Sequence, residues 1–120
     1  MKLALIAHDG KKDEMARFVL EHRDKLRGYD LVATGTTADV VRKASGLQPR
    51  AVLSGPRGGD VQIAAEVLDG GFAAVLFFCE PMEAHPHDPD IQTLQRICLL
   101  TDTPIATNPA TAKLLIAGLG

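Results

Sequence analysis

The sequence contains few aromatic residues and no tryptophan. Four phenylalanines and one tyrosine make up 4% of its 120 residues. Proteins that bind single-stranded nucleic acids stack the bases on several aromatic rings, and this chain has too few for such a platform. The net charge is −2, and no run of lysine or arginine offers a surface for nucleic-acid phosphates. We therefore expect no nucleic-acid partner.

The sequence also lacks long hydrophobic runs. No apolar stretch approaches the ~20 residues of a membrane span, and the N-terminus enters a predicted strand directly, without the pattern of a signal peptide. The two cysteines, Cys79 and Cys98, lie in apolar surroundings and form no Cys-x-x-Cys motif. We expect no membrane partner and a cytoplasmic location, with both thiols reduced and buried.

The overall composition is typical of a globular protein. Hydrophobic residues make up 46% of the chain and charged residues 23%. A chain of 120 residues is long enough for one full core and too short for two. We expect a single domain over residues 1–120.

Short apolar runs alternate with segments of helical period. Strands are predicted at 3–7, 29–33, 50–53, 73–78 and 103–106. The helical stripes between them are Met15-Phe18-Val19-His22-Leu26, Val40-Val41-Ala44-Leu47, Val61-Ala64-Ala65-Leu68 and Ile91-Leu94-Ile97-Cys98, followed by a last helix over 110–117. The first and fourth strands are almost continuously apolar, which is typical of a parallel sheet covered on both faces. The pattern predicts an α/β fold, a three-layer doubly wound domain with a central, mainly parallel five-stranded sheet.

Doubly wound sheets bind ligands beyond the carboxyl ends of their strands, and polar residues follow the predicted strands here. His8, Asp9 and Lys12 come after the first strand. Lys12 falls near a helix N-terminus, where its ammonium and the backbone N–H groups could meet a phosphate, and His8 could donate a hydrogen bond to a substrate oxygen. The alternative is a solvated lysine pair with Asp9 as a helix cap.

The second strand ends in a loop rich in hydroxyl groups. Thr34, Gly35, Thr36 and Thr37 offer three hydroxyls and several N–H donors to an oxyanion. A helix cap alone would need only one of these threonines.

The third strand leads into residues 54–60, with the sequence SGPRGGD. Ser54 adds a hydroxyl, Gly55 a bare N–H, and Asp60 a carboxylate at the start of a helix. These residues predict a phosphate cradle with a base beside it, or else a glycine-rich turn in which Asp60 only caps the helix. Arg57 could grip a phosphate or a neighbouring subunit, or lie in solvent.

The fourth strand leads into a loop with two histidines. Pro86 and Pro89 stiffen the chain around His87 and fix where its imidazole points. His85 and His87 with Asp88 lack two further ligands at metal spacing, so we expect no metal site.

Four of the five strand ends carry motifs that occur together in one family. They are His8-Asp9 with Lys12, Thr34-Gly35-Thr36-Thr37, Ser54-Gly55-Pro56 with Gly58-Gly59-Asp60, and His87-Asp88-Pro89-Asp90. As a set they resemble methylglyoxal synthase over essentially the whole chain. The resemblance implies an enzyme that converts dihydroxyacetone phosphate to methylglyoxal and inorganic phosphate without a metal or organic cofactor. It also implies a homo-oligomer, usually a hexamer, that phosphate inhibits.

The resemblance further implies roles for single residues. Asp60 matches the family's catalytic base, and Asp90 matches an acidic residue that supports the site. His8 and His87 match residues around the substrate's oxygens. The matches to phosphate and substrate contacts are Lys12, Thr34, Gly35, Thr36, Thr37, Ser54 and Gly55.

Three features depart from the family's pattern. Glu80 stands where the family commonly carries Asp, and we regard Glu80 and Asp9 as possible supporting residues. Cys79 stands where the family often has a bulkier residue. The chain stops at Gly120, earlier than many members, so we expect no intersubunit contact of the kind a longer tail would make.

The implied reaction has needs that these residue types meet. A carboxylate such as Asp60 can take the proton next to the substrate's carbonyl. The resulting enediolate needs hydrogen-bond donors, a task suited to His87 with help from His8. Phosphate leaves only if its C–O bond stands roughly perpendicular to the enediolate plane, and we expect the phosphate contacts to fix that torsion.

Two alternatives stay open at this point. One is a non-catalytic domain of the same fold that senses a phosphate effector and needs neither Asp60 nor His87. The other is an isomerase of the triose phosphate isomerase type, which shares the base and the electrophile but retains the phosphate.

Overall fold

The chain forms one five-stranded sheet, seen here in a computed structural model that describes residues 1–83, 85 and 88–119. The strands are β1 (Lys2–Ala7), β2 (Asp30–Thr34), β3 (Arg50–Val52), β4 (Phe72–Phe78) and β5 (Ile105–Ala106). Their order is β3-β2-β1-β4-β5, and every neighbouring pair is parallel. The predicted central sheet is confirmed.

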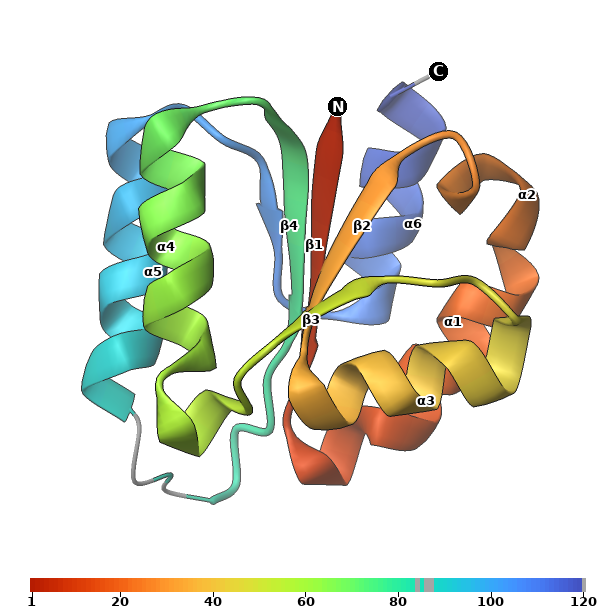
Figure 1. Cartoon of the computed structure of the whole chain (residues 1–120), viewed down its shortest axis with the longest axis horizontal. Helices are drawn as coiled ribbons and strands as arrows, with labels where there is room; N and C mark the ends of the chain where they lie inside the picture. Colours follow the sequence, from red (N-terminus) through yellow and green to blue (C-terminus); the bar gives the residue numbers. More distant parts are fainter. Residues whose placement is uncertain (84, 86–87, 120) are drawn as a thin grey trace.

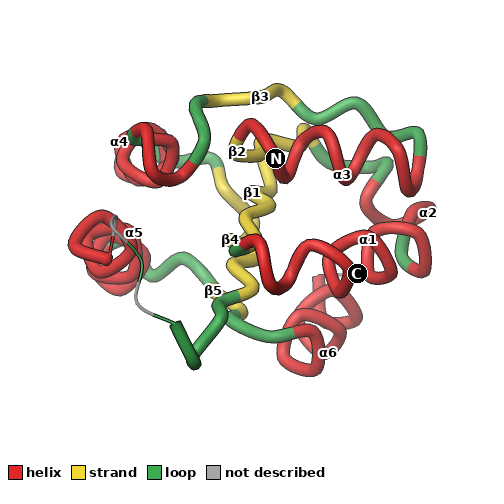
Figure 2. Tube along the Cα trace, turned by 90° about the horizontal axis from the view of Figure 1, so that it is seen from below, coloured by secondary structure: helices red, strands yellow, loops and turns green. Residues whose placement is uncertain are grey.

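Helices cover both faces of the sheet, as Figure 1 and Figure 2 show. On one side lie α1 (Lys12–Glu21), α2 (Arg23–Leu26), α3 (Gly35–Ser45) and α6 (Pro109–Leu119), and on the other α4 (Gly59–Asp69) and α5 (Asp88–Leu100). Two short 3-10 helices, η1 (Asp9–Lys11) and η2 (Gly55–Arg57), follow β1 and β3. Among the described residues, no helix has the length and apolar character that crossing a membrane requires.

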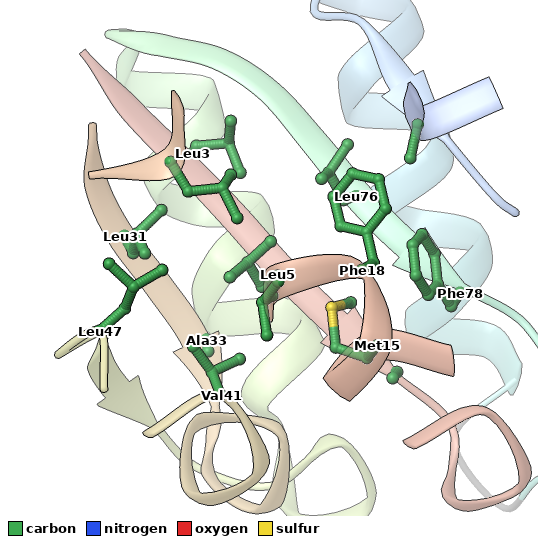
Figure 3. Packing of buried hydrophobic residues seen from close by; sticks show 14 of the residues in the cluster. Leu3, Leu5, Met15, Phe18, Leu31, Ala33, Val41, Leu47, Leu76 and Phe78 are labelled. Atoms are coloured by element: carbon green, nitrogen blue, oxygen red, sulfur yellow. The ribbon is translucent and has the colours of Figure 1, made fainter. Parts of the chain in front are cut away.

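Two apolar layers hold the helices to the sheet. Successive side chains of a strand point to opposite faces, so Leu3 and Leu5 join the layer that contains Met15 and Phe18 of α1 (Figure 3). Ile6 joins the other layer, beneath α4 and α5. All seven residues of β4 are buried. The continuous apolar runs in the sequence therefore reflect a sheet that is covered on both faces.

The first predicted helical stripe is divided between two helices. The backbone of His22 turns between α1 and α2, with φ −108° and ψ 20°. Met15, Phe18 and Leu26 from this stripe are nevertheless buried in one layer. The stripe therefore identifies the core-facing side correctly but not the break in the helix.

The buried face of α4 agrees only in part with the predicted one. Ala64 of the predicted stripe is buried, but Val61 and Leu68 have 44% and 58% of their surface exposed. The other core-facing residues are Asp60, Ile63 and Val67, which share one helix face at spacings of three and four. This orientation places the Asp60 carboxylate inside the protein.

Two glycines set the orientation of α4. Gly58 adopts a φ of +105°, in the left-handed region that glycine tolerates, and ends η2. A Cβ on Gly59 would lie 1.9 Å from the carbonyl oxygen of Leu53. The N–H of Gly59 also donates a hydrogen bond to the carbonyl of Ser54 at 3.0 Å. The start of α4 is thus pressed against the end of β3, and this contact determines which face of the helix turns inward.

The close approach of Gly59 to the Leu53 carbonyl predicts that a side chain at this position destabilises the fold. We expect Gly59→Ala to lower the free energy of unfolding by about 3 kcal/mol or more, because backbone rather than a flexible side chain must move. Urea denaturation followed by circular dichroism measures the change. Gly118→Ala in α6 is the matched control, since nothing lies within 4 Å of a Cβ there, and its effect should stay within ~1 kcal/mol. Equal stability of the two variants would contradict the close approach.

Candidate active site

The carboxyl ends of the strands meet at the lower edge of the sheet in Figure 1. The chain moves outward from β1 to β2 and β3, then returns to the other side of β1 as β4. The loops after β1 and β4 therefore diverge, and such a point is where doubly wound sheets bind ligands. A cavity of about 310 Å³ lies here, and its described lining consists of Ile6, Ala7, His8, Asp9, Gly10, Lys12, Thr34, Thr36, Gly55, Pro56, Glu83 and His85.

A larger cavity opens at the opposite edge of the sheet. Its volume is about 510 Å³, and its lining includes Lys2, Tyr29 and Arg50. The described residues around it contain none of the predicted site residues. We therefore take the cavity at the carboxyl edge as the candidate active site, because it gathers residues from the loops after β1, β2, β3 and β4.

Lys12 presents a partly dehydrated ammonium to this cavity. It is the first residue of α1, and only 16% of its side-chain surface is exposed. Its Nζ donates hydrogen bonds to the carbonyl of Ala7 and, at 3.3 Å, to Oδ1 of the exposed Asp9. Burial lowers the pKa of Lys12, and the negative charges of Asp9 and Asp60 oppose that shift. The end of β1 thus holds a cation where a phosphate could reach it.

His8 lies buried at the end of β1 in a defined protonation state. Its Nδ1 accepts a hydrogen bond from the backbone N–H of Glu80 at 2.8 Å. An acceptor nitrogen carries no proton, so the ring is neutral and its Nε2 carries the N–H. The ring also meets Phe77 edge-on and stacks on His85, with centroids 5.2 and 3.8 Å away. His8 is therefore a hydrogen-bond donor through Nε2.

The three threonines of the second loop occupy different environments. The hydroxyl of Thr37, which is fully buried, accepts hydrogen bonds from the N–H of Ala7 and the hydroxyl of Thr34, both at 3.1 Å. It also donates to the carbonyl of Ala7 at 3.4 Å. Thr36 lies exposed at the cavity. The structure thus brings Thr34 and Thr36 to the cavity and uses Thr37 to tie α3 to the end of β1.

Gly35 and Ser54 are not in the described lining of the cavity. The N–H of Gly35 donates to the carbonyl of Leu53 at 3.4 Å, which joins the start of α3 to the end of β3. The carbonyl of Ser54 accepts the N–H groups of Arg57 and Gly59, each at 3.0 Å. These bonds shape the third loop so that Gly55 reaches the cavity.

Asp60 is buried in the first turn of α4, where the helix dipole favours a negative charge. Its charge attracts the ammonium of Lys12 across the loops. It also acts on the Cys79 thiol, whose pKa is raised to about 11 by burial and, second, by Asp60. Asp60 therefore lies close to both the loop after β1 and the end of β4.

The fourth loop begins with a turn at Glu80. Its Oε1 accepts a hydrogen bond from the N–H of Met82 at 2.9 Å, and its Oε2 lies 3.0 Å from where a Cβ on Gly10 would be. The fourth loop thus packs against the first, which lets the Glu80 N–H reach His8. His87 lies outside the described residues, and Asp90 is half-buried in the first turn of α5.

Two ionisable residues at the cavity were not among the predicted contacts. Glu83 lines it, as does His85, which the sequence suggested only as a weak metal ligand. The N–H of His85 donates to Oδ2 of Asp88 at 3.2 Å, and its carbonyl accepts the Asp88 N–H at the same distance. The only sequence signal for His85 is its position two residues before His87. No three His, Cys, Asp or Glu side chains of the described residues gather as a metal site would require.

Comparison with known proteins places this geometry in a family. The family model for the MGS-like domain matches residues 14–107. A methylglyoxal synthase of Thermus thermophilus is 53% identical over 115 residues, which cover 96% of this chain and 91% of that protein. The uncharacterized protein sll0036 of Synechocystis is 51% identical over 118 residues, and this chain spans only 27% of its length. A crystal structure of methylglyoxal synthase from Elizabethkingia anophelis NUHP1 matches 97% of this chain and 76% of its own, with a TM-score of 0.90 and 40% identity.

The hydrogen bonds of Thr37 predict a structural rather than a ligand-binding role. We expect Thr37→Val to lower the free energy of unfolding by about 1–3 kcal/mol, because the buried N–H of Ala7 loses its acceptor. Thr37→Ser keeps the hydroxyl and is the control. Both are measured by chemical denaturation. If the valine variant were as stable as the wild type and lost only phosphate affinity, the hydroxyl would be a ligand instead.

Proposed function

The chain belongs to the methylglyoxal synthase family, an enzyme family of lyases, and we propose that it converts dihydroxyacetone phosphate to methylglyoxal and inorganic phosphate. One observation carries the assignment to this site. The ammonium of Lys12, which lines a cavity of about 310 Å³, feels the charge of the Asp60 carboxylate, which is fully buried and is not in the cavity's described lining. That volume suits a small phosphorylated metabolite.

Asp60 is the proposed general base. It removes a proton from the carbon next to the substrate's carbonyl and so forms an enediolate. Its place in the first turn of α4 at the carboxyl edge of the sheet, where its charge acts on the Lys12 ammonium, supports this role. We assign Asp90, in the first turn of α5, a supporting role near the same edge of the sheet.

His8 is the proposed donor to the enediolate oxygen, together with His87 by family resemblance. A neutral imidazole stabilises the oxygen without protonating it early, as an imidazolium would. The bond from the Glu80 N–H to Nδ1 supports this, since it leaves the proton on Nε2. The supporting role of Glu80 is then to shape the turn that supplies this N–H.

The substrate's phosphate is proposed to bind between Lys12, Thr36 and Gly55. Lys12 contributes charge, with Asp9 holding its ammonium in place. Thr34, Thr36 and Gly55 line the cavity and offer hydroxyl and backbone N–H groups, while Gly35, Thr37 and Ser54 hold the backbone of these loops in place. Held there, the C–O bond to phosphate stands out of the enediolate plane, so the electron pair expels phosphate rather than returning to carbon.

We further propose the cofactor requirement, the product inhibition, the location and the oligomeric state of the protein. By family resemblance the reaction requires no organic cofactor or metal, and the product phosphate also inhibits by occupying the same cavity. Residues 1–120 act as one cytoplasmic domain in a homo-oligomer, a hexamer by family resemblance. The exposed apolar residues Leu53, Val61 and Leu68 support association between copies.

A product assay tests the proposed function. Purified protein is incubated with dihydroxyacetone phosphate, and inorganic phosphate and methylglyoxal are both followed over time. The proposal predicts their release in equal amounts. Formation of glyceraldehyde 3-phosphate would point to an isomerase, and binding without turnover would point to a sensing domain.

The role of Asp60 predicts a large loss of turnover in one variant. We expect Asp60→Asn to lower kcat by ~10²–10⁴, the usual contribution of a general base. Asp69→Asn, the same change at the exposed end of α4, should leave kcat unchanged. Both are measured by the product assay. A value of kcat within tenfold of the wild type in Asp60→Asn would show that another group removes the proton.

A further inference from the structure

His85 lies at the cavity wall, in face-to-face contact with His8. The two imidazole centroids are 3.8 Å apart, and their planes meet at 30°. The His85 backbone is held on both sides by Asp88, through its N–H and its carbonyl. The side chain is half-buried and lines the same cavity as Lys12 and Thr36. It therefore belongs to the proposed phosphate site by position.

The described charges around the cavity are more negative than positive, so a bound phosphate would require a second cation. Lys12 is the ammonium in the described lining, whereas Asp9 and Glu83 contribute two carboxylates, and the buried Asp60 adds a third charge close by. A phosphate dianion entering such a cavity meets a negative balance. Lys12 alone does not reverse it, because Asp9 already pairs with its ammonium at 3.3 Å.

We propose that His85, as an imidazolium, is a phosphate-binding residue of this site. The inference rests on the proposed function only in that the cavity binds the substrate's phosphate. Histidine is the side chain that changes charge between about pH 5 and 8, and a phosphate dianion favours its charged form.

Of the two stacked rings, His85 is the one that can take up an additional proton, because Nδ1 of His8 is already occupied as a hydrogen-bond acceptor. Protonating His8 at Nδ1 would break its hydrogen bond from the Glu80 N–H. Among the described residues, Asp9, Lys12 and Glu83 line the same cavity as His85, and Asp88 holds the His85 backbone.

Binding of inorganic phosphate tests this role without relying on turnover. Dissociation constants are measured by calorimetry for the wild type and His85→Asn at about pH 6 and about pH 8.5. Comparing variants at one pH cancels the titration of phosphate itself. We expect His85→Asn to bind phosphate roughly tenfold more weakly at the lower pH, the value of one charge-assisted hydrogen bond, and about equally at the higher pH.

Three further variants make the test specific. His22→Asn, in which the lost ring packs on Phe18 outside the cavity, should bind phosphate as the wild type does. His85→Lys keeps a charge at both pH values and should bind well at both. Glu83→Gln removes one carboxylate and should tighten binding a few-fold. Thermal melts establish that each variant is folded.

The outcomes separate this inference from the proposed function. Phosphate affinity that is unchanged in His85→Asn at the lower pH, or lowered equally at both, would overturn the role of His85 even if the enzyme turns over. Loss of affinity in the pattern expected would support it even if no methylglyoxal formed. If His85→Asn does not fold, His85→Lys decides: a pH dependence of binding like that of the wild type would overturn the proposal.

Discussion

The burial of the Asp60 carboxylate is the constraint on which the rest of the site depends. A charge removed from water is costly unless neighbouring groups compensate for it. The N-terminus of α4 supplies part of that compensation, and the Lys12 ammonium supplies an attraction across the loops. Gly59 makes the arrangement possible, because only a residue without a Cβ lets the first turn of α4 approach the Leu53 carbonyl so closely. The junction between β3 and α4 thus positions the Asp60 carboxylate.

Hydrogen bonds within the protein then decide what the neighbouring loops present to a ligand. The Thr37 hydroxyl is occupied with the backbone of Ala7 at the end of β1, which leaves Thr36 exposed at the cavity. The Glu80 N–H occupies Nδ1 of His8 and so places the proton on Nε2. The loop after β4 therefore acts on the chemistry through His8, by fixing the tautomer of a residue 72 positions earlier. The candidate site thus presents donors whose positions are fixed by hydrogen bonds within the protein.

The sequence predicted the sheet, the edge where the site lies and the residue types at that edge, because these follow from local apolar patterns and from the rule for parallel sheets. It predicted the buried face of α4 only in part. That helix has apolar residues on two faces, and the contact of Gly59 with Leu53 selects the one that carries Asp60. Nor do the three threonines of residues 34–37 reveal which one bonds to Ala7, thirty residues from Thr37. The buried face of α4 and the bonds of Thr37 depend on contacts between segments far apart in the sequence. The periodicity of a single segment carries no information about such contacts.

The most direct test of this account is a crystal structure with a phosphorylated analogue of the enediolate bound. We expect its phosphate to contact Lys12, Thr36 and Gly55, and the enediolate oxygen to accept a hydrogen bond from Nε2 of His8. An Asp60 oxygen should then lie about 3–3.5 Å from the carbon that loses its proton. An analogue bound instead in the cavity at the amino edge of the sheet, or one whose reacting carbon lies out of reach of Asp60, would contradict the account.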